Sequence, residues 1–381
     1  MKSKAYKKFI LLSKEVLANG IEEPEISNIS TDEIFTDYKT FKAHTHFQKI
    51  KKLNNLADHL NNFENQAKKR DIKVLWATNY EDVSEEIKKI KKTYEIKNAW
   101  YKTDYILEEI GIQYFFKENN IRLSSTDESD VLIYQSNGII EDSGSIYFEF
   151  DDRASLESIS LNKPKIIVCG IDSIFCNMQE VESYRSVRSF HKKQKKSPLY
   201  SLVYNPYKEP VKSPVFVIIV DNGRSELLEE PEIRKTLACI HCGACSKVCP
   251  VSKSVGKEPY DNIFWGPVSN VILPYLEDKE EYKYLSYACT LCGKCEQVCP
   301  MSIPLTRLIL KNRNQLSEHK QGKLYSYLSN RKKMNSASWI KNSVISMNLS
   351  SDFKKSRKLR SIQDKTFNQL WLEQNKDKQD V

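Results

Sequence analysis

Glycine is scarce in this chain. Only 11 of its 381 residues are glycine, and none of them forms a G-x-G-x-x-G or G-x-x-x-x-G-K-[ST] pattern. Those patterns let backbone amides approach the phosphates of a dinucleotide or nucleotide closely. The sequence also shows no recognisable Ser/His/Asp or Cys/His catalytic grouping. The sequence therefore argues against a binding site for a flavin, a nicotinamide or a nucleotide. A site that oxidises a substrate is expected on another protein.

Long apolar runs are also missing. No stretch approaches the roughly 20 apolar residues that a membrane-spanning helix needs. The segment from Met1 to Leu12 begins with basic residues but offers too short an apolar run for a secretory signal. The expected location is the cytoplasm.

Charge is unevenly distributed. The net charge is +9, and the segment from Lys311 to Val381 holds 16 Lys and Arg residues against 6 Asp and Glu. The rest of the chain is nearly neutral, which predicts a neutral body with a basic tail and no nucleic-acid-binding domain. An acidic partner or an anionic membrane surface could attract the tail, and a solvated tail is the alternative. Its densest basic cluster is Lys354, Lys355, Arg357, Lys358 and Arg360.

The hydrophobic pattern predicts an α/β region followed by a helical one. Helical spacing runs from about 41 to 70. Strands are then expected at 72–77, 97–102, 131–134, 145–150, 166–168 and 215–220, with helices at 81–94 and 104–119. This alternation is typical of a parallel-rich sheet covered on both faces. Pro231 is expected to open a short helix, and further helices are expected at 270–276, 279–287 and 305–316. The predicted domains are 1–228, 229–316 and the tail 317–381.

Eight of the ten cysteines lie in two runs with the pattern C-x2-C-x2-C-x3-C-P. The runs are Cys239-Ile-His-Cys242-Gly-Ala-Cys245-Ser-Lys-Val-Cys249-Pro250 and Cys289-Thr-Leu-Cys292-Gly-Lys-Cys295-Glu-Gln-Val-Cys299-Pro300. Two-residue gaps allow three thiolates to surround one face of a cubane cluster. In two-cluster ferredoxins the fourth cysteine ligates the other cluster. The pattern therefore predicts two [4Fe–4S] clusters, one on Cys239, Cys242, Cys245 and Cys299, the other on Cys289, Cys292, Cys295 and Cys249.

Structural zinc and disulfides are the alternatives. A zinc site needs only two C-x2-C pairs, whereas each run here supplies four cysteines and a following proline. Disulfide scaffolds are small, secreted and dense in cysteine, unlike this long chain. The insert between the two runs carries expected helices, which favours an α-helical dicluster module over a compact hairpin type. Its apolar residues Phe264, Trp265, Ile272 and Leu273 could shield the clusters from water or simply pack a core.

The remaining candidates carry weaker signals. Cys169 and Cys176 are interpreted as buried, inert thiols. His241, between two ligands, is interpreted as a solvent-facing spacer, with donation to a sulfide as the alternative. His44, His46 and His59 are expected on the polar face of the N-terminal helical segment. The residues from Lys192 to Lys196 are interpreted as a solvated loop.

The order of several further segments resembles the lactate utilization protein B family over about 53–313. The segments that carry the resemblance are Leu107-Glu-Glu-Ile-Gly111, Asp142-Ser-Gly-Ser145, Val220-Asp-Asn-Gly-Arg-Ser-Glu-Leu-Leu228, Leu237-Ala-Cys-Ile-His-Cys-Gly-Ala-Cys245, Trp265-Gly-Pro267, Leu291-Cys-Gly-Lys-Cys295 and Cys299-Pro-Met-Ser-Ile303. The cysteine runs alone would match many ferredoxin-like subunits. Their combination with Asp-Asn-Gly-Arg just upstream is more specific.

The resemblance implies an α/β LUD domain of the NagB/RpiA/CoA-transferase-like type, followed by the dicluster ferredoxin domain. It implies an electron-transfer subunit of a complex that oxidises L-lactate to pyruvate, not catalytic alone. The implied partners are a cysteine-rich subunit of the heterodisulfide-reductase type and a cluster-free LUD-domain protein.

Two segments depart from the family. Arg185-Ser-Val-Arg-Ser189 replaces Arg-Ser-Ala-Thr-Gly-Gln, and Gly256-Lys-Glu258 replaces Gly-Gly-His. These changes leave the expected electron-transfer role untouched, but they leave open which substrate is oxidised. The alternatives are an electron-transfer subunit for another hydroxyacid or a quinone-linked oxidoreductase, and a non-catalytic iron–sulfur binding or sensing protein.

Overall fold

The structure is a computed structural model that describes residues 38–102, 104–193, 200–206, 213–256, 260, 266–276 and 279–315, with a few positions between 365 and 374. The chain divides into two compact units, Met1–Leu316 and Ser317–Val381. The basic cluster expected at 354–360 lies outside the described residues, as do Phe264, Trp265 and most of the loop expected at 192–196. No described helix is long and apolar enough to cross a membrane.

A parallel sheet of six strands forms the centre of the first unit, in the order β1-β10-β7-β4-β2-β3. Its strands are β1 (Ile72–Ala77), β2 (Asn98–Tyr101), β3 (Arg122–Leu123), β4 (Val131–Gln135), β7 (Lys165–Gly170) and β10 (Val215–Val220). The pattern predicted all of these strands except the two-residue β3. Strands β4, β7 and β10 are buried along their whole length, as expected for parallel strands covered on both faces.

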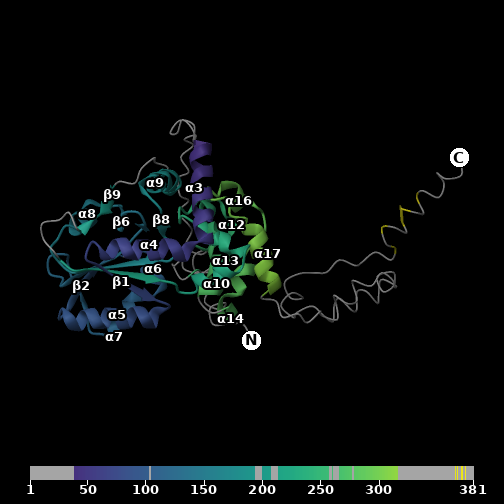
Figure 1. The fold of residues 1–381 in the computed structure, drawn as a ribbon. Helices are drawn as coiled ribbons and strands as arrows, with labels where there is room; N and C mark the ends of the chain where they lie inside the picture. The colour runs from purple at the N-terminus through teal and green to yellow at the C-terminus, as the bar shows by residue number, and fades with distance from the viewer. Residues whose placement is uncertain are drawn as a thin grey trace. The chain divides into compact units, whose positions relative to one another are not determined.

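Helices cover the two faces of this sheet. They are α4 (Leu56–Lys68) on one face, and α5 (Tyr80–Thr93), α6 (Tyr105–Glu109) and α7 (Ile112–Glu118) on the other. Alternate residues of β10 point to opposite sides: Val217 packs with Phe63 of α4, and Ile218 packs with Ile87 of α5. Figure 1 shows α4 above the sheet, with α5 and α7 below it. The predicted α/β layering is therefore confirmed.

Two of the predicted helices are each broken in two. The segment 41–70 contains α3 (Tyr38–Asn54) and α4, separated at Asn55. The segment 104–119 contains α6 and α7, separated where Gly111 adopts a left-handed φ of 61°. Glycine accepts that conformation without the steric cost that other residues meet, so the chain can change direction there.

A second sheet went unpredicted. It has four strands in the order β8-β5-β6-β9, with parallel and antiparallel pairs. Of these, only β6 (Ser145–Phe150) was expected; β5 (Gly138–Ile140), β8 (Ile174–Phe175) and β9 (Tyr200–Tyr204) were not. Two helices, α8 (Arg153–Ser158) and α9 (Met178–Lys193), were also missed. Strands of two or three residues are too short to produce a clear alternation.

The cysteine region is helical, as predicted. Its elements are α10 (Arg224–Glu229), the 3-10 helix η2 (Ile233–Ala238), α11 (Ala244–Val248), α12 (Pro250–Val255), α13 (Ser269–Leu276), α14 (Lys279–Tyr282), α15 (Tyr284–Tyr287), α16 (Lys294–Val298) and α17 (Leu305–Gln315). The helix expected at Pro231 begins two residues later, as η2. One apolar cluster joins Tyr184 and Val187 of α9 to Leu273 of α13 and Leu308 of α17. The cysteine region therefore shares a core with the α/β region, and its limits as a separate domain remain a prediction.

Candidate metal centre

The two cysteine runs have the same backbone conformation. In the first, His241 and Gly243 have positive φ values of 51° and 72°, and α11 follows directly. In the second, Leu291 and Gly293 have φ values of 55° and 75°, and α16 follows. Repetition of such an uncommon conformation in two segments of different sequence indicates that the cysteine spacing determines it.

Backbone amides point at the cysteine sulfurs. The amide of His241 donates to Sγ of Cys239 at 3.4 Å, and the amide of Leu291 donates to Sγ of Cys289 at 3.3 Å. The amide of Ser252 likewise donates to a sulfur, Sγ of Cys249, at 3.5 Å. Hydrogen bonds of this kind stabilise negative charge on sulfur and tune iron–sulfur clusters.

The fourth cysteine of the second run lies among the first three of the first run. Burial raises the pKa of Cys242 to about 11, and the nearby charge of Cys299 adds to the rise. The pKa of Cys245 is raised to about 12 by burial, Cys242 and Cys299. For Cys239, burial, Cys245 and Cys242 raise the pKa, with a further contribution from Cys299. Cys299 is therefore close enough to influence all three cysteines of the first run, and these four thiols are called the first group below.

The remaining four thiols form the reciprocal group. Burial raises the pKa of Cys295 to about 12, with contributions from Cys289 and Cys249. Burial also raises the pKa of Cys289, next to Cys249 and Cys292. Because Cys295 also contributes to the raised pKa of Cys245 in the other group, the two groups are neighbours.

This arrangement fits two cubane clusters. Each group offers four soft sulfur donors, and a Cβ added at Gly243 or Gly293 would meet no protein atom within 4 Å. Buried thiols with raised pKa values become thiolates only when a cation compensates their charge. The crossed grouping is the one that the predicted ligand sets require, although ligation itself remains a prediction.

The two groups differ in exposure. The first group contains the buried Cys242 and Cys299 and no exposed cysteine, whereas the second contains the exposed Cys292 together with the buried Cys295. The Cys292 side is therefore the part of the centre that is open to solvent. Near Cys299, a cavity of about 470 Å³ lies between α3 and the Cys-Pro turn. The cavity is lined by Lys39, Lys42, Ala43, His46, Phe47, Ile50, Pro300 and Ser302.

Arginines outside the runs hold both of them in place. Arg188 of α9 donates through Nε to the carbonyl of Ile240 at 2.9 Å and pairs with Glu149 of β6. Arg313 of α17 donates through Nη2 to the carbonyl of Cys289 at 2.7 Å. The structure places the segment 185–189, which contains Arg188, inside α9. Arg188 therefore provides an anchor for the first run.

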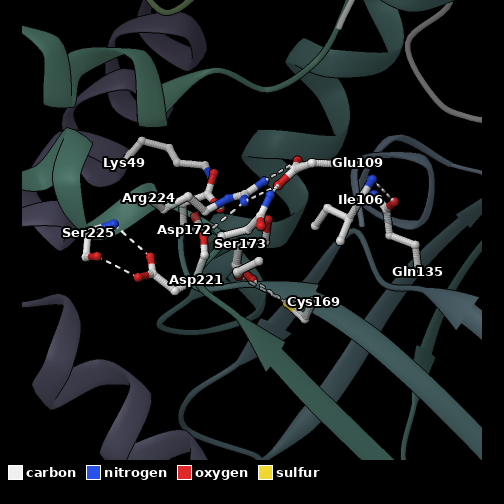
Figure 2. A network of polar contacts seen from close by, with 12 residues as sticks. Lys49, Ile106, Glu109, Gln135, Cys169, Asp172, Ser173, Asp221, Arg224 and Ser225 are labelled. Carbon is white, nitrogen blue, oxygen red and sulfur yellow. Dashed lines mark hydrogen bonds and ion pairs between the residues drawn. The ribbon is translucent and has the colours of Figure 1, made fainter. Parts of the chain in front are cut away.

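A buried polar network lies at the carboxyl ends of β7 and β10 (Figure 2). The guanidinium of Arg224 donates to both carboxylate oxygens of Glu109, at 2.7 and 2.8 Å. Its Nε donates to Oδ1 of Asp172 at 2.9 Å. The Arg224 side chain is 3% exposed, and the two carboxylates are 0% and 7% exposed, so the charge of the guanidinium is compensated by two carboxylates away from water.

The backbone around the network is tightly packed. A Cβ at Gly170 would lie 2.6 Å from Oδ1 of Asp172, so any larger residue there would displace the Asp172 side chain. Lys49 of α3 donates to the carbonyl oxygen of Asp172 at 3.1 Å. Burial lowers the pKa of Lys49, while Asp172 and Cys239 oppose this change, so Lys49 lies between the network and the first cysteine group.

The interpretation of His241 as a solvent-facing spacer is wrong. Its ring stacks on Tyr105, with ring centroids 4.1 Å apart. Burial lowers the pKa of His241 to about 3, so the ring is neutral at neutral pH. Tyr105 begins α6, which carries Glu109, so the stack is a second connection between the first run and the polar network. No sequence signal in either segment indicates this pairing.

The two cysteines outside the runs differ from each other. Cys169 of β7 is fully buried, and its thiol donates to the carbonyls of Gly170 and Ser173, as expected of an inert thiol. Cys176 is only partly buried and lies near His59, which in turn contacts Glu141. Sequence reasoning missed the role of His59 in this contact.

The cysteine region matches a known protein family. A family model described as a 4Fe-4S dicluster domain matches residues 235–303, a range that contains all eight paired cysteines. The chain carries two [4Fe–4S] clusters in this domain. The prediction of the cofactors is therefore confirmed.

About half of the chain is similar to curated proteins named Lactate utilization protein B. The identity is 36% over 200 residues to the proteins of Bacillus subtilis and Bacillus velezensis, and 34% over 199 residues to that of Bacillus cytotoxicus. The match covers 51% of this chain but only 41–42% of those relatives, so the chain spans less than half of their length.

A solved structure is also similar: a DUF162 family protein from Deinococcus radiodurans, with 18% identity and a TM-score of 0.32. The similarity covers 43% of this chain and 98% of that protein.

Proposed function

We propose that this chain is an iron–sulfur electron-transfer subunit of a complex that oxidises L-lactate to pyruvate, and that the chemistry at C2 of lactate takes place on a partner protein. The observation that carries the proposal is the presence of all eight paired cysteines inside a 4Fe-4S dicluster domain. The name of the similar proteins, Lactate utilization protein B, supplies the substrate.

The chain's own geometry suits a relay of two electrons. Oxidation of a 2-hydroxy acid releases two electrons, and each [4Fe–4S] cluster takes up one. Helices α11 and α16, which belong to the first and the second cysteine run, pack against each other. The two clusters would therefore be held next to each other by a single packed unit.

The polar network supports a relay more than an active site. Arg224 is a buried cation that could bind a substrate carboxylate, but its guanidinium already pairs with Glu109 and Asp172. Replacing Glu109 with a substrate would leave a buried carboxylate without compensation, at a cost of several kcal/mol. The network therefore serves the structure and not substrate binding. It connects α6, α10 and the loop after β7, next to the first run.

The proposed partners are a cysteine-rich subunit of the heterodisulfide-reductase type and a cluster-free LUD-domain protein, assembled in the cytoplasm. A reducing compartment keeps such thiols available for iron. The exposed side at Cys292 gives one partner access to the second group. A non-catalytic role for the clusters is the competing proposal.

The test is lactate-dependent reduction followed anaerobically by visible absorption and electron paramagnetic resonance. Dithionite should reduce the isolated chain reversibly, whereas L-lactate should not. Addition of the two partner proteins should allow L-lactate to reduce the clusters, with D-lactate as the control for stereospecific catalysis. Cys292→Ala should abolish this reduction, because it removes a ligand of the exposed group.

Each other outcome has a defined meaning. Lactate oxidation by the chain alone would contradict the relay and place an active site in the α/β region. If a different 2-hydroxy acid reduced the clusters and lactate did not, the proposed substrate would be wrong, but the proposed electron relay would stand. Failure of dithionite to reduce the clusters reversibly would support a structural role.

A further inference from the structure

Three potential metal ligands meet away from the paired cysteines, at the edge of the second sheet. Glu141 directly follows β5 and Cys176 directly follows β8, and these two strands run parallel. Their carboxyl ends therefore lie together, and the amide of Glu141 donates to the carbonyl of Phe175 at 2.8 Å. His59 reaches the same point from α4.

The three side chains converge on one ring nitrogen. Oε2 of Glu141 lies 2.6 Å from Nδ1 of His59, and Sγ of Cys176 lies 3.9 Å from the same Nδ1. One ligand atom from each residue lies within 4.8 Å of the other two. In a cysteine–histidine–acid catalytic triad, the thiol and the acid use opposite ring nitrogens. Convergence on one nitrogen instead resembles ligands around a common centre.

We propose that His59, Glu141 and Cys176 bind one divalent cation of the zinc type, in a site separate from the two iron–sulfur groups and not required by the proposed function. Zinc accepts nitrogen, oxygen and thiolate ligands in a tetrahedral arrangement, and three protein ligands leave the fourth position to water. Zinc-bound nitrogen and sulfur atoms lie roughly 3.5 Å apart, close to the separation of His59 and Cys176. The carboxylate would move back from its hydrogen bond to roughly 3.3 Å.

Neighbouring side chains prepare the ligands. Asn62 donates to Oε1 of Glu141 at 2.8 Å, which leaves Oε2 to face the imidazole. Glu180 accepts the amide of Cys176 at 2.9 Å and pairs with Lys52, so the ammonium group of Lys52 is held on Glu180. Hydrogen bonds from surrounding residues orient metal ligands in this way.

Access and protonation are also compatible with metal binding. The His59 and Glu141 side chains are 23% and 16% exposed, so an ion can reach them from solvent. Burial and the charge of Glu180 raise the pKa of Cys176 to about 12. The thiol is therefore protonated without a cation, and binding should release a proton.

The test uses the full chain with its clusters, prepared anaerobically. The protein is treated with a mild chelator, incubated with zinc sulfate and desalted, and its zinc and iron are counted by mass spectrometry. X-ray absorption at the zinc edge then reports the neighbours of zinc without interference from iron. We expect about one zinc per chain, with one sulfur neighbour and the rest nitrogen or oxygen.

Variants decide between this site and the cluster cysteines. Cys176→Ser and His59→Gln should lose the zinc while keeping wild-type iron, and Asn62→Ala should weaken zinc binding about tenfold. The matched control is Cys169→Ser, a buried cysteine outside the group, which should retain the zinc. Zinc with several sulfur neighbours, zinc retained by Cys176→Ser, or no zinc retained by wild type at micromolar concentration would each overturn the proposal. If Cys176→Ser loses iron, Glu141→Gln replaces it in the comparison.

Discussion

At the scale of single residues, Cys299 distinguishes crossed from uncrossed ligation. It lies in the second run, but it contributes to the raised pKa values of Cys242, Cys245 and Cys239 in the first. If two substitutions remove ligands of the same cluster, the double variant should lose no more iron than either single variant. If they remove ligands of different clusters, the iron losses should add.

We predict that Cys242→Ala combined with Cys299→Ala leaves about four irons per chain, from about eight in the wild type. Cys292→Ala combined with Cys299→Ala should bring iron close to zero, because each variant then removes a ligand of a different cluster. Iron and sulfide analysis of anaerobic protein provides the measurement. The reverse pattern would mean that each run holds its own cluster.

The sequence predicted these eight cysteines because their spacing is a local property. His241 and His59 show where that reasoning ends. The ring of His241 stacks on Tyr105, and His59 contacts Glu141, in each case more than 80 residues away along the chain. Such pairs depend on how the sheets and helices pack, and a single sequence contains no local signal for them.

At the scale of elements, the turn between β10 and α10 is tightly constrained. Gly223 has a φ of 80°, and a Cβ there would lie 2.7 Å from the carbonyl oxygen of Tyr275 in α13. An alanine at position 223 would be strained by the left-handed conformation and would also clash with the backbone of Tyr275. Gly111 is the matched control, because its φ is 61° but the added Cβ would meet only the side chain of Tyr114, at 3.1 Å.

We predict that Gly111→Ala lowers the free energy of unfolding by about 1 kcal/mol, from left-handed strain alone. Gly223→Ala should cost at least about 2 kcal/mol, because α13 must also shift. It should also accelerate iron loss, since α13 packs in the core that contains Cys242. Anaerobic urea unfolding and iron release measure the two effects. Equal losses from both variants would show that the contact with Tyr275 is unimportant.

The same elements explain which parts of the fold were predictable. Strands such as β10 have continuous apolar sequences because both faces are buried, and the pattern located them correctly. The break at Gly111 and the short strands β5 and β8 were missed. Three residues or fewer give no measurable periodicity, and their pairing is determined by the larger sheet beside them. The proposed cation site lies at the ends of those two strands, which is why the sequence did not reveal it.

At the scale of the whole molecule, one apolar cluster contains residues of both the cysteine region and the α/β region, and the basic tail belongs to a separate compact unit. All eight paired cysteines precede Leu316, where the first unit ends. Residues 317–381 contain 14 Lys and Arg against 6 Asp and Glu, so their removal lowers the net charge by 8. The tail is therefore expected to contribute to association and not to the folding of the first unit.

We predict that a chain ending at Leu316 keeps about eight irons and the urea midpoint of the full chain. Its association with the cysteine-rich partner should weaken at low salt, where the charge of the tail acts over a Debye length of roughly 10 Å or more. At high salt the two forms should bind equally, because screening removes the contribution of the tail. Sedimentation of the mixed proteins at both salt concentrations is the measurement. Equal binding at low salt would assign the tail no role in docking to this partner, and iron loss on truncation would show that the first unit depends on it.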